Sequence, residues 1–281
     1  MTVVTSFEQA YEEWIDRPHR DYRRSIGTPV NLDAAAFEEF VQRLRAYRAA
    51  YPSMALWLTM DYSTLSAMQS EGDINVFGAP VRSKRDLVAR IHPDYLLPYL
   101  RWRRSAYALM SLYPEKVRQP LKHTFRISLP FKTHSGQYWW FCMNSAIVQQ
   151  DAQGRIATTV ETLYRESTWS RHNLRPLEAS LFSHEPQEEG LNAELAGQLS
   201  LLLMELFTDA ELDLLALYAS GTRTDSVLAA MKWSRHTLHE YNTHLLRKAR
   251  ELFVYEFKNA RQFAEYCQER HILKFKPHSP K

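Results

Sequence analysis

Basic and histidine side chains gather in one short stretch near the C-terminal end of this 281-residue sequence. Between Lys232 and Arg250 there are five basic residues and one acidic residue, Glu240, a net charge of four positive, whereas the whole chain carries +3. The stretch contains Lys232, Arg235, Arg247, Lys248 and Arg250, together with His236, His239 and His244. Binding of nucleic-acid phosphates needs such a concentration of donors on one face. The stretch is therefore a candidate binding surface.

The neighbouring residues predict helices that would position these side chains. Thr208 followed by Glu211 forms a capping box at the start of a helix, and Gly221 ends that helix. A short helix around Val227 follows, and Ser234 caps a longer one. Two helices joined by a tight turn, with the second starting at a serine cap, are typical of a helix-turn-helix.

The same residues resemble a LuxR-type (NarL/FixJ-type) DNA-binding domain. Tyr241 stands where the family usually has histidine, and Ala249 stands where it has leucine. The family implies a fourth helix, which Asn259 to Arg270 can supply. The matching residues are Phe207-Thr208-x-x-Glu211-x-x-Leu214-Leu215-x-Leu217-x-Ala219-x-Gly221, then Val227-x-x-x-Met231-x-Trp233-Ser234-x-x-Thr237-Leu238, then Leu245-Leu246-Arg247-Lys248.

The resemblance also implies double-stranded DNA as a partner and assigns roles to residues of the last stretch. By position, the family's base-contacting sites fall on His239, Glu240 and Thr243, and its phosphate-contacting sites fall near Arg235, Thr237, Arg247 and Lys248. Glu240 could accept a hydrogen bond from a cytosine amino group, or it could point away from the groove.

The first half of the chain predicts a sheet. Hydrophobic residues alternate from Phe125 to Phe131, make up almost all of Tyr138 to Val148, and alternate again from Ile156 to Tyr164. Short turns containing Gly136 and Gly154 separate these runs, so they predict an antiparallel meander. Upstream elements are a helix capped by Asp33 and broken at Pro52, a strand over Ala55 to Met60, and a helix from Pro93 to Leu112.

This order of elements, from Ala55 to Glu166, resembles a PAS domain. In that family the meander and the helices enclose a pocket that binds a small ligand, or the outer sheet face transmits a signal. The resemblance therefore implies a small-molecule or protein signal. It rests on Asp61, Phe77-Gly78, Ile91-His92-Pro93-Asp94, Gly136-x-Tyr138-Trp139-Trp140 and Asp151-x-x-Gly154-Arg155-Ile156.

No cofactor and no enzymatic activity are predicted. A flavin adduct needs a reactive cysteine in an Asn-Cys-Arg run, whereas Cys142 lies in the middle of a strand. His92 and His123 are the candidate haem ligands, and His92 fits a helix start better. His236 and His239 share a helix face without an evident third zinc ligand. The sequence also lacks a Gly-x-Ser-x-Gly elbow, a phosphate loop and a His-Glu-x-x-His run.

The predicted fold class is α+β, with a PAS-like antiparallel sheet domain followed by an all-α helix-turn-helix domain. We assign residues 1–54 to a helical extension, 55–168 to the PAS-like domain, 169–206 to a linker with an amphipathic helix, and 207–281 to the DNA-binding domain. Leu191, Leu195, Leu199, Leu202 and Leu206 form one stripe on the linker helix. That stripe packs either on its own chain or against a second copy in a homodimer.

A cytoplasmic location is expected. The two cysteines cannot form a disulfide framework, and no export signal is evident. The richest apolar run, Leu199 to Met204, is far shorter than a membrane span requires. These features predict a sequence-specific transcriptional regulator with a PAS-like sensory or dimerisation domain. The alternative is a signalling or scaffolding protein whose C-terminal helical domain binds a protein partner.

Overall fold

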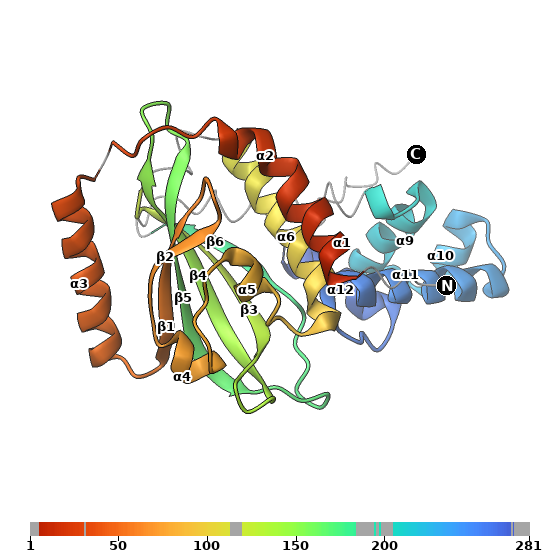
Figure 1. The fold of residues 1–281 in the computed structure, drawn as a ribbon. Helices are drawn as coiled ribbons and strands as arrows, with labels where there is room; N and C mark the ends of the chain where they lie inside the picture. Colours follow the sequence, from red (N-terminus) through yellow and green to blue (C-terminus); the bar gives the residue numbers. More distant parts are fainter. Residues whose placement is uncertain are drawn as a thin grey trace. The chain divides into compact units, whose positions relative to one another are not determined.

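The chain folds into two compact units, residues 1–189 and 190–281. The computed structural model describes residues 6–30, 32–112, 120–183, 194, 197, 205–270 and 272. The first unit contains an antiparallel sheet and helices, and the described part of the second unit is helical. The predicted α+β fold class is therefore confirmed (Figure 1).

A single six-stranded sheet organises the first unit, in the order β2-β1-β5-β4-β3-β6. Neighbouring strands are antiparallel throughout, so the predicted meander is confirmed as β3-β4-β5. Register shifts interrupt the β4–β5 pairing, which changes the alternation of side chains along these strands. The strands are β1 (Met54–Asp61), β2 (Ser66–Glu71), β3 (His123–Lys132), β4 (Tyr138–Gln150), β5 (Ile156–Thr168) and β6 (Ala179–Ser183).

Strand β6 corrects the domain boundary assigned from the sequence. It lies inside the range 169–206 that we assigned to the linker, yet it pairs with β3 from His123↔Ser183 to Ile127↔Ala179. The sheet therefore extends beyond residue 168. The mixed composition of residues 169–190, with Pro176 and Pro186, predicted a linker. Pairing with β3 at the edge of the sheet instead determines the conformation of this strand.

Helices lie on both sides of the sheet (Figure 1). Helix α3 packs Phe37 and Val41 against Trp57, Val148 and Val160 on one face. Helix α6 runs along the other side in Figure 1, with the N-terminal helices beside it. The helices of this unit are α1 (Phe7–Tyr11), the π-helix η1 (Glu12–Asp16), α2 (Arg17–Arg24), α3 (Ala34–Ala50), α4 (Asp73–Phe77), α5 (Lys84–Val88) and α6 (Pro93–Leu112).

The N-terminal extension is tied to the sheet at the β4–β5 turn. Gly27 donates its backbone N–H to the Asp151 carboxylate at 2.8 Å, and Ile156 N–H donates to the Tyr22 hydroxyl at 2.9 Å. Burial alone would raise the pKa of Asp151, but hydrogen bonds from Gly27, Arg155 and Gln153 outweigh it and lower the pKa to about 2. The carboxylate therefore stays ionised and holds both the turn and the extension.

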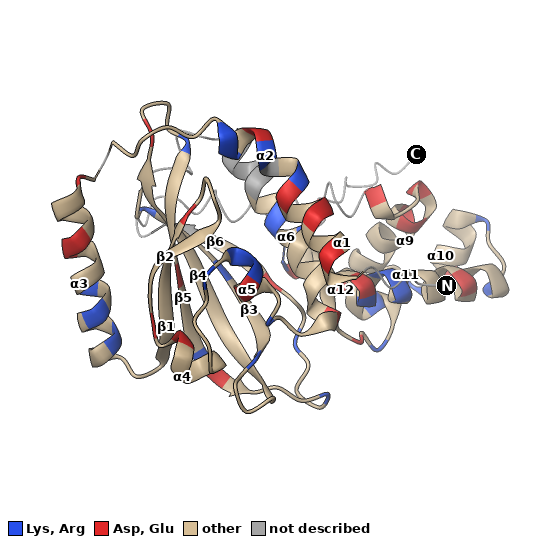
Figure 2. Cartoon of the chain, in the orientation of Figure 1, with Lys and Arg blue, Asp and Glu red and all other residues tan. Residues whose placement is uncertain are grey.

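The second unit consists of α9 (Asp209–Ala219), α10 (Thr224–Met231), α11 (Arg235–Phe253) and α12 (Ala260–Glu269) in its described part. Asn259 caps α12 through the Gln262 N–H, so the predicted fourth helix is confirmed. Phe253, Phe257 and Phe263 form an aromatic core, with centroid separations of 5.1 to 6.1 Å. Helix α9 carries acidic side chains and no basic one, whereas α11 carries four basic side chains (Figure 2).

Two further predictions meet different outcomes. Within the described residues, no helix has both the length and the apolar character needed to cross a membrane. Of the predicted leucine stripe, only Leu206 is described, and Leu191, Leu195, Leu199 and Leu202 lie outside the described residues. The amphipathic linker helix therefore stays a prediction.

Candidate functional site

A tight turn joins α10 to α11. Lys232 adopts the left-handed conformation at φ 55°, and the Trp233 N–H donates to the Leu228 carbonyl at 3.0 Å. A left-handed residue and a backbone hydrogen bond of this kind end a helix and turn the chain sharply. The Ser234 hydroxyl then accepts from the Thr237 N–H at 3.1 Å and starts α11. The predicted helix-turn-helix is thus formed by these residues.

Helix α9 begins and ends where the sequence predicted. The Thr208 hydroxyl accepts from the Glu211 N–H at 3.3 Å, and the Glu211 carboxylate accepts from the Thr208 N–H at 2.7 Å. This is the reciprocal capping box. At the other end Gly221 is left-handed at φ 76°, and the Thr222 N–H reaches the Leu217 carbonyl at 3.0 Å. Glycine adopts this conformation without a Cβ clash.

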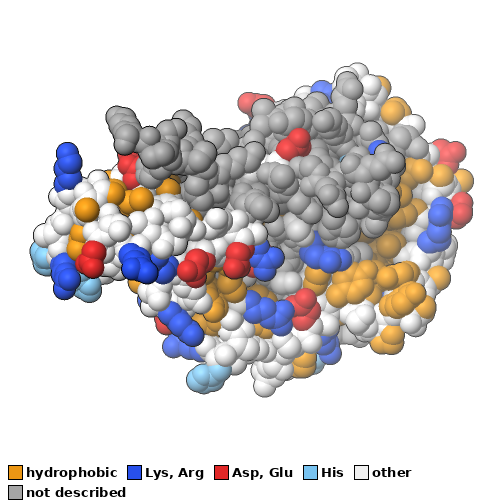
Figure 3. Space-filling view, turned by 180° about the vertical axis from the view of Figure 1, so that it is seen from behind, with side chains coloured by type: hydrophobic (Ala, Val, Ile, Leu, Met, Phe, Trp, Pro, Cys, Tyr) orange, Lys and Arg blue, Asp and Glu red, His pale blue; other side chains and the backbone are white. Residues whose placement is uncertain are grey.

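Helix α11 has a buried face and an exposed polar face. Leu238, Leu245, Ala249, Leu252 and Phe253 are buried in the unit. Opposite them, five of the seven residues implied as DNA contacts are exposed, namely Arg235, His239, Glu240, Thr243 and Arg247, while Thr237 and Lys248 are partly buried. Histidine and basic side chains are visible on the surface of this unit (Figure 3).

The exposed side chains on the polar face of α11 make only weak contacts within the protein. Arg235 lies 3.7 Å from Asp225, and both side chains are 87% exposed, so solvent screens the pair. His236 Nε2 lies 3.5 Å from the Glu240 carboxylate one turn away. The Thr243 hydroxyl donates to the His239 carbonyl at 3.0 Å. Arg235 and Glu240 can therefore exchange these contacts for an external partner at small cost.

Lys248 is placed differently from the other residues of the set. Its ammonium lies 2.5 Å from the Glu211 carboxylate and 5.2 Å from the Phe207 ring centroid. Burial alone would raise the pKa of Glu211, but hydrogen bonds from Lys248 and Thr208 outweigh it and hold the pKa below its usual range. Lys248 thus joins the end of α11 to the capping box of α9.

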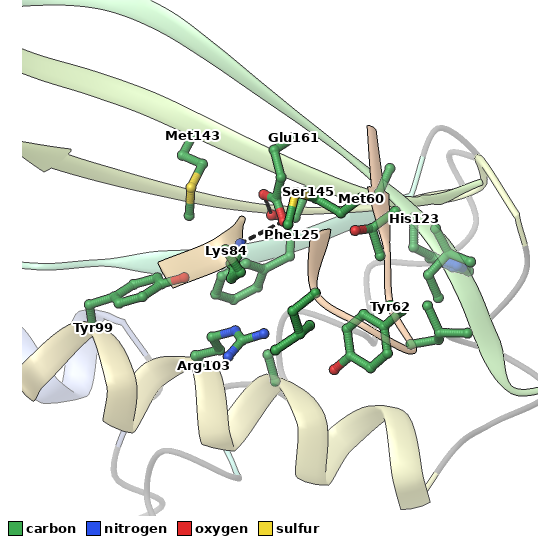
Figure 4. Close-up of a pocket in the computed structure, with 16 residues that line it drawn as sticks. Met60, Tyr62, Lys84, Tyr99, Arg103, His123, Phe125, Met143, Ser145 and Glu161 are labelled. Carbon is green, nitrogen blue, oxygen red and sulfur yellow. Dashed lines mark hydrogen bonds and ion pairs between the residues drawn. The ribbon is translucent and has the colours of Figure 1, made fainter. Parts of the chain in front are cut away.

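A second candidate site is a cavity inside the first unit, with a volume of about 70 Å³ (Figure 4). The sheet, α5 and α6 contribute its walls. Most lining side chains are apolar or aromatic, and they include Met60, Leu65, Phe125, Met143, Ile147 and Ile156. A mostly apolar cavity with a few polar groups is the usual form of a small-molecule site.

The polar side chains of the cavity form a defined cluster. Lys84 Nζ lies 2.6 Å from Glu161 Oε1, with only 4% and 5% of the two side chains exposed. The Ser145 hydroxyl donates to the other oxygen of Glu161. Arg103 and Tyr99 project toward the cavity from α6 (Figure 4). Burial raises the pKa of Tyr99, which therefore keeps its hydroxyl proton.

Neither Lys84 nor Glu161 was predicted from the sequence as a site residue. They are 77 positions apart in the chain, and only the fold brings them together. Glu161 lies among apolar and threonine residues from Ile156 to Tyr164, and a carboxylate in such a run was the available signal. Lys84 carries no comparable signal, because a lysine at a helix start is ordinarily exposed.

His92 and His123, the candidate haem ligands, have different surroundings. The His92 ring packs against Tyr138 and Trp169, with centroid distances of 4.5 and 4.2 Å, and its Nδ1 accepts from the Asp94 N–H. Burial lowers the pKa of His92, which favours the neutral ring. His123 lines the cavity. In the part of the chain that the structure describes, no three His, Cys, Asp or Glu side chains are grouped to hold a metal ion.

Cys142 lies on the sheet face opposite the cavity, next in sequence to the cavity residue Met143. Burial raises the pKa of its thiol, which disfavours the reactive thiolate.

Comparisons with known proteins give structural similarities at low identity. No family model matches the sequence, and no curated protein matches it significantly. Phage VqmA in complex with DPO is 12% identical, covers 87% of this chain and 94% of its own, and has a TM-score of 0.31. The Vibrio cholerae VqmA dimer, whose description refers to LuxR-type receptors, is 12% identical, with 82% and 88% covered and a TM-score of 0.30.

A third solved structure matches a smaller part of the chain. It is the N-terminal domain of a diguanylate cyclase with a PAS/PAC sensor from Marinobacter aquaeolei, at 14% identity. It covers 40% of this chain and 94% of its own length, with a TM-score of 0.28. Similarities at this level do not assign the chain to a family.

Proposed function

We propose that this protein is a sequence-specific DNA-binding transcriptional regulator whose first unit responds to a small molecule. The observation that carries the proposal is the arrangement of α11. It follows a tight turn from α10, its apolar side is buried, and its other side presents exposed histidine, arginine, threonine and glutamate side chains. A helix of this kind can enter the major groove and read base edges.

Within this proposal the exposed residues divide by chemistry. Arg235 and Arg247 contact phosphates, and Thr237 contacts one at the start of the helix, where N–H groups favour anions. His239, Glu240 and Thr243 face the bases, with Glu240 accepting from a cytosine amino group. Lys248 stabilises the unit through Glu211 instead of contacting a phosphate.

The signal is assigned to the cavity of the first unit, and the protein acts as a homodimer. The cavity has apolar walls and a buried cluster of Lys84, Glu161 and Ser145, which together can orient a small ligand. A dimer would present two copies of α11 to two half-sites about one helical turn apart.

Selection from a pool of random DNA duplexes tests the proposal. The full-length protein is expected to enrich one sequence, and to bind it more tightly than the starting pool at the same salt concentration. A variant with His239→Ala, Glu240→Ala and Thr243→Ala is expected to keep salt-sensitive binding to any duplex but to enrich none. Failure of the folded protein to bind duplex DNA at low salt would refute the proposal and favour a protein-binding second unit.

A further inference from the structure

The charged lining of the cavity indicates which chemical class of ligand it takes. Glu161 is the one carboxylate among the described residues that line the cavity, and both of its oxygens already accept hydrogen bonds, from Lys84 and from Ser145. A ligand cation or donor would have to compete with these buried contacts. The carboxylate is therefore part of the wall, and it positions the Lys84 ammonium at the cavity surface.

Arg103 adds a second cationic group to the same cavity. Its side chain is buried, with 7% of the residue exposed, and Figure 4 shows the guanidinium directed into the space between α6 and the sheet. A guanidinium has five N–H donors in a planar fork, so it can bind a ligand carboxylate in addition to its interactions within the protein. Tyr99, one turn earlier on α6, lies beside it as another cavity-lining donor.

The remaining walls fit a short hydrocarbon chain. Met60, Met143 and Ile147 line the sheet side, and methionine side chains adapt their shape to small apolar groups. The volume of about 70 Å³ is roughly half that of an engineered cavity of about 150 Å³ that holds benzene. A compact ligand therefore fits, and a large aromatic one does not.

We infer that the ligand is a short-chain carboxylic acid, with its carboxylate on Arg103 and its hydrocarbon chain against Met60, Met143 and Ile147. This inference rests on the proposed role of the cavity as the signal site. A buried carboxylate needs a cation and several donors, and Arg103, Lys84 and Tyr99 provide them within one cavity. The neutral amide of the same acid fills the same volume but forgoes the charge-assisted hydrogen bonds.

Isothermal titration calorimetry of the full-length protein with butyrate and butyramide tests the inference. Butyrate is expected to bind about tenfold more tightly than butyramide, which corresponds to one charge-assisted contact. Arg103→Gln is expected to bring the two affinities within about twofold of each other. Arg104→Gln, at the neighbouring exposed position of α6, is the matched control and is expected to keep the preference for the acid.

Two further variants keep the test decisive if Arg103→Gln does not fold. Arg103→Lys keeps the charge and is expected to retain part of the preference. Ala106→Leu extends hydrocarbon into the cavity from the same helix and is expected to weaken binding of the acid at least tenfold. Equal or tighter binding of butyramide, no binding of butyrate at tens of millimolar, or an unchanged preference in Arg103→Gln would overturn the inference. None of these titrations contains DNA, so failure here is distinguishable from failure of the regulator proposal.

Discussion

Lys248 and Glu211 join two helices of the second unit through an ion pair of 2.5 Å between the ammonium and the carboxylate. Glu211 is also the acidic partner of the capping box at Thr208, and only 3% of its side chain is exposed. The pair therefore connects the start of α9 with the last turns of α11. A lysine that resembles a phosphate contact in sequence is engaged within the protein.

Removal of this lysine is expected to destabilise the second unit. Lys248→Met leaves the Glu211 carboxylate buried without its cation, so the free energy of unfolding should fall by about 2 kcal/mol. Arg247→Met, at the adjacent exposed position, should change it by less than about 0.5 kcal/mol. Urea denaturation of each variant, monitored by hydrogen exchange in peptides from 208–253, measures both changes in the free energy of unfolding. Equal stability of the two variants would show that the pair contributes nothing.

Arg247 is expected to determine the salt dependence of DNA binding. Its exposed side chain lies on the polar face of α11, and each phosphate contact releases counterions. Arg247→Ala should weaken binding to all duplexes alike and reduce the slope of log affinity against log salt by about 0.9. Fluorescence anisotropy from about 50 to 200 mM salt measures the slope. Lys258→Ala, an exposed lysine outside α11, should leave it unchanged.

Asp151 is expected to make the first unit sensitive to acid. Its pKa is lowered to about 2 in the folded protein, below the ordinary value of 3.8 for an aspartate. A lowered pKa means that its contribution is fully present above about pH 4 and is lost as the pH falls through about 2. Asp151→Asn should therefore cost on the order of 2 kcal/mol at neutral pH and flatten the loss of stability between pH 4 and 2. Asp21→Asn, whose carboxylate is fully exposed, should retain the wild-type pH profile.

Helix boundaries in the second unit were predictable because local chemistry determines them. The side chains of Thr208, Ser234 and Asn259 each accept a hydrogen bond from a backbone N–H three residues later and so start a helix. Gly221 ends α9, where the next N–H bonds to the Leu217 carbonyl. The exposure of the polar face of α11 was also predictable, from the spacing of the apolar residues on its other face. The engagement of Lys248 did not, because its partner lies 37 positions earlier.

The cavity was predictable only from the resemblance of the first half of the sequence to a PAS domain. Its polar cluster joins Lys84 from α5 with Glu161 from β5 and Ser145 from β4. Register shifts in the β4–β5 pairing determine which strand side chains face inward, and no local pattern encodes them. Strand β6 was missed for a related reason, because its stability comes from pairing with β3.

Tyr241 replaces the histidine usual in the resembling family, and its ring stacks on Trp233 with centroids 4.1 Å apart at 23°. The stack connects α11 to the turn before it. Tyr241→Ala should destabilise the turn by about 1 kcal/mol, which corresponds to about fivefold faster hydrogen exchange in peptides covering 228–242. Tyr241→His keeps an aromatic ring and should exchange within about twofold of wild type. Unchanged exchange in Tyr241→Ala would show that the stack does not hold the turn.

The proposed homodimer depends on the leucine stripe of the linker, which lies mostly outside the described residues. Leu195→Glu with Leu202→Glu would place two carboxylates on that stripe, and each is costly to bury. We expect a folded monomer by light scattering at micromolar concentration, with much weaker binding to a two-half-site duplex and nearly unchanged binding to a single half-site. Ala193→Glu with Ser200→Glu adds the same charge on the opposite side of the predicted helix and should leave the dimer intact. If the unmodified protein is monomeric with and without DNA, the stripe packs within its own chain and the dimer proposal fails.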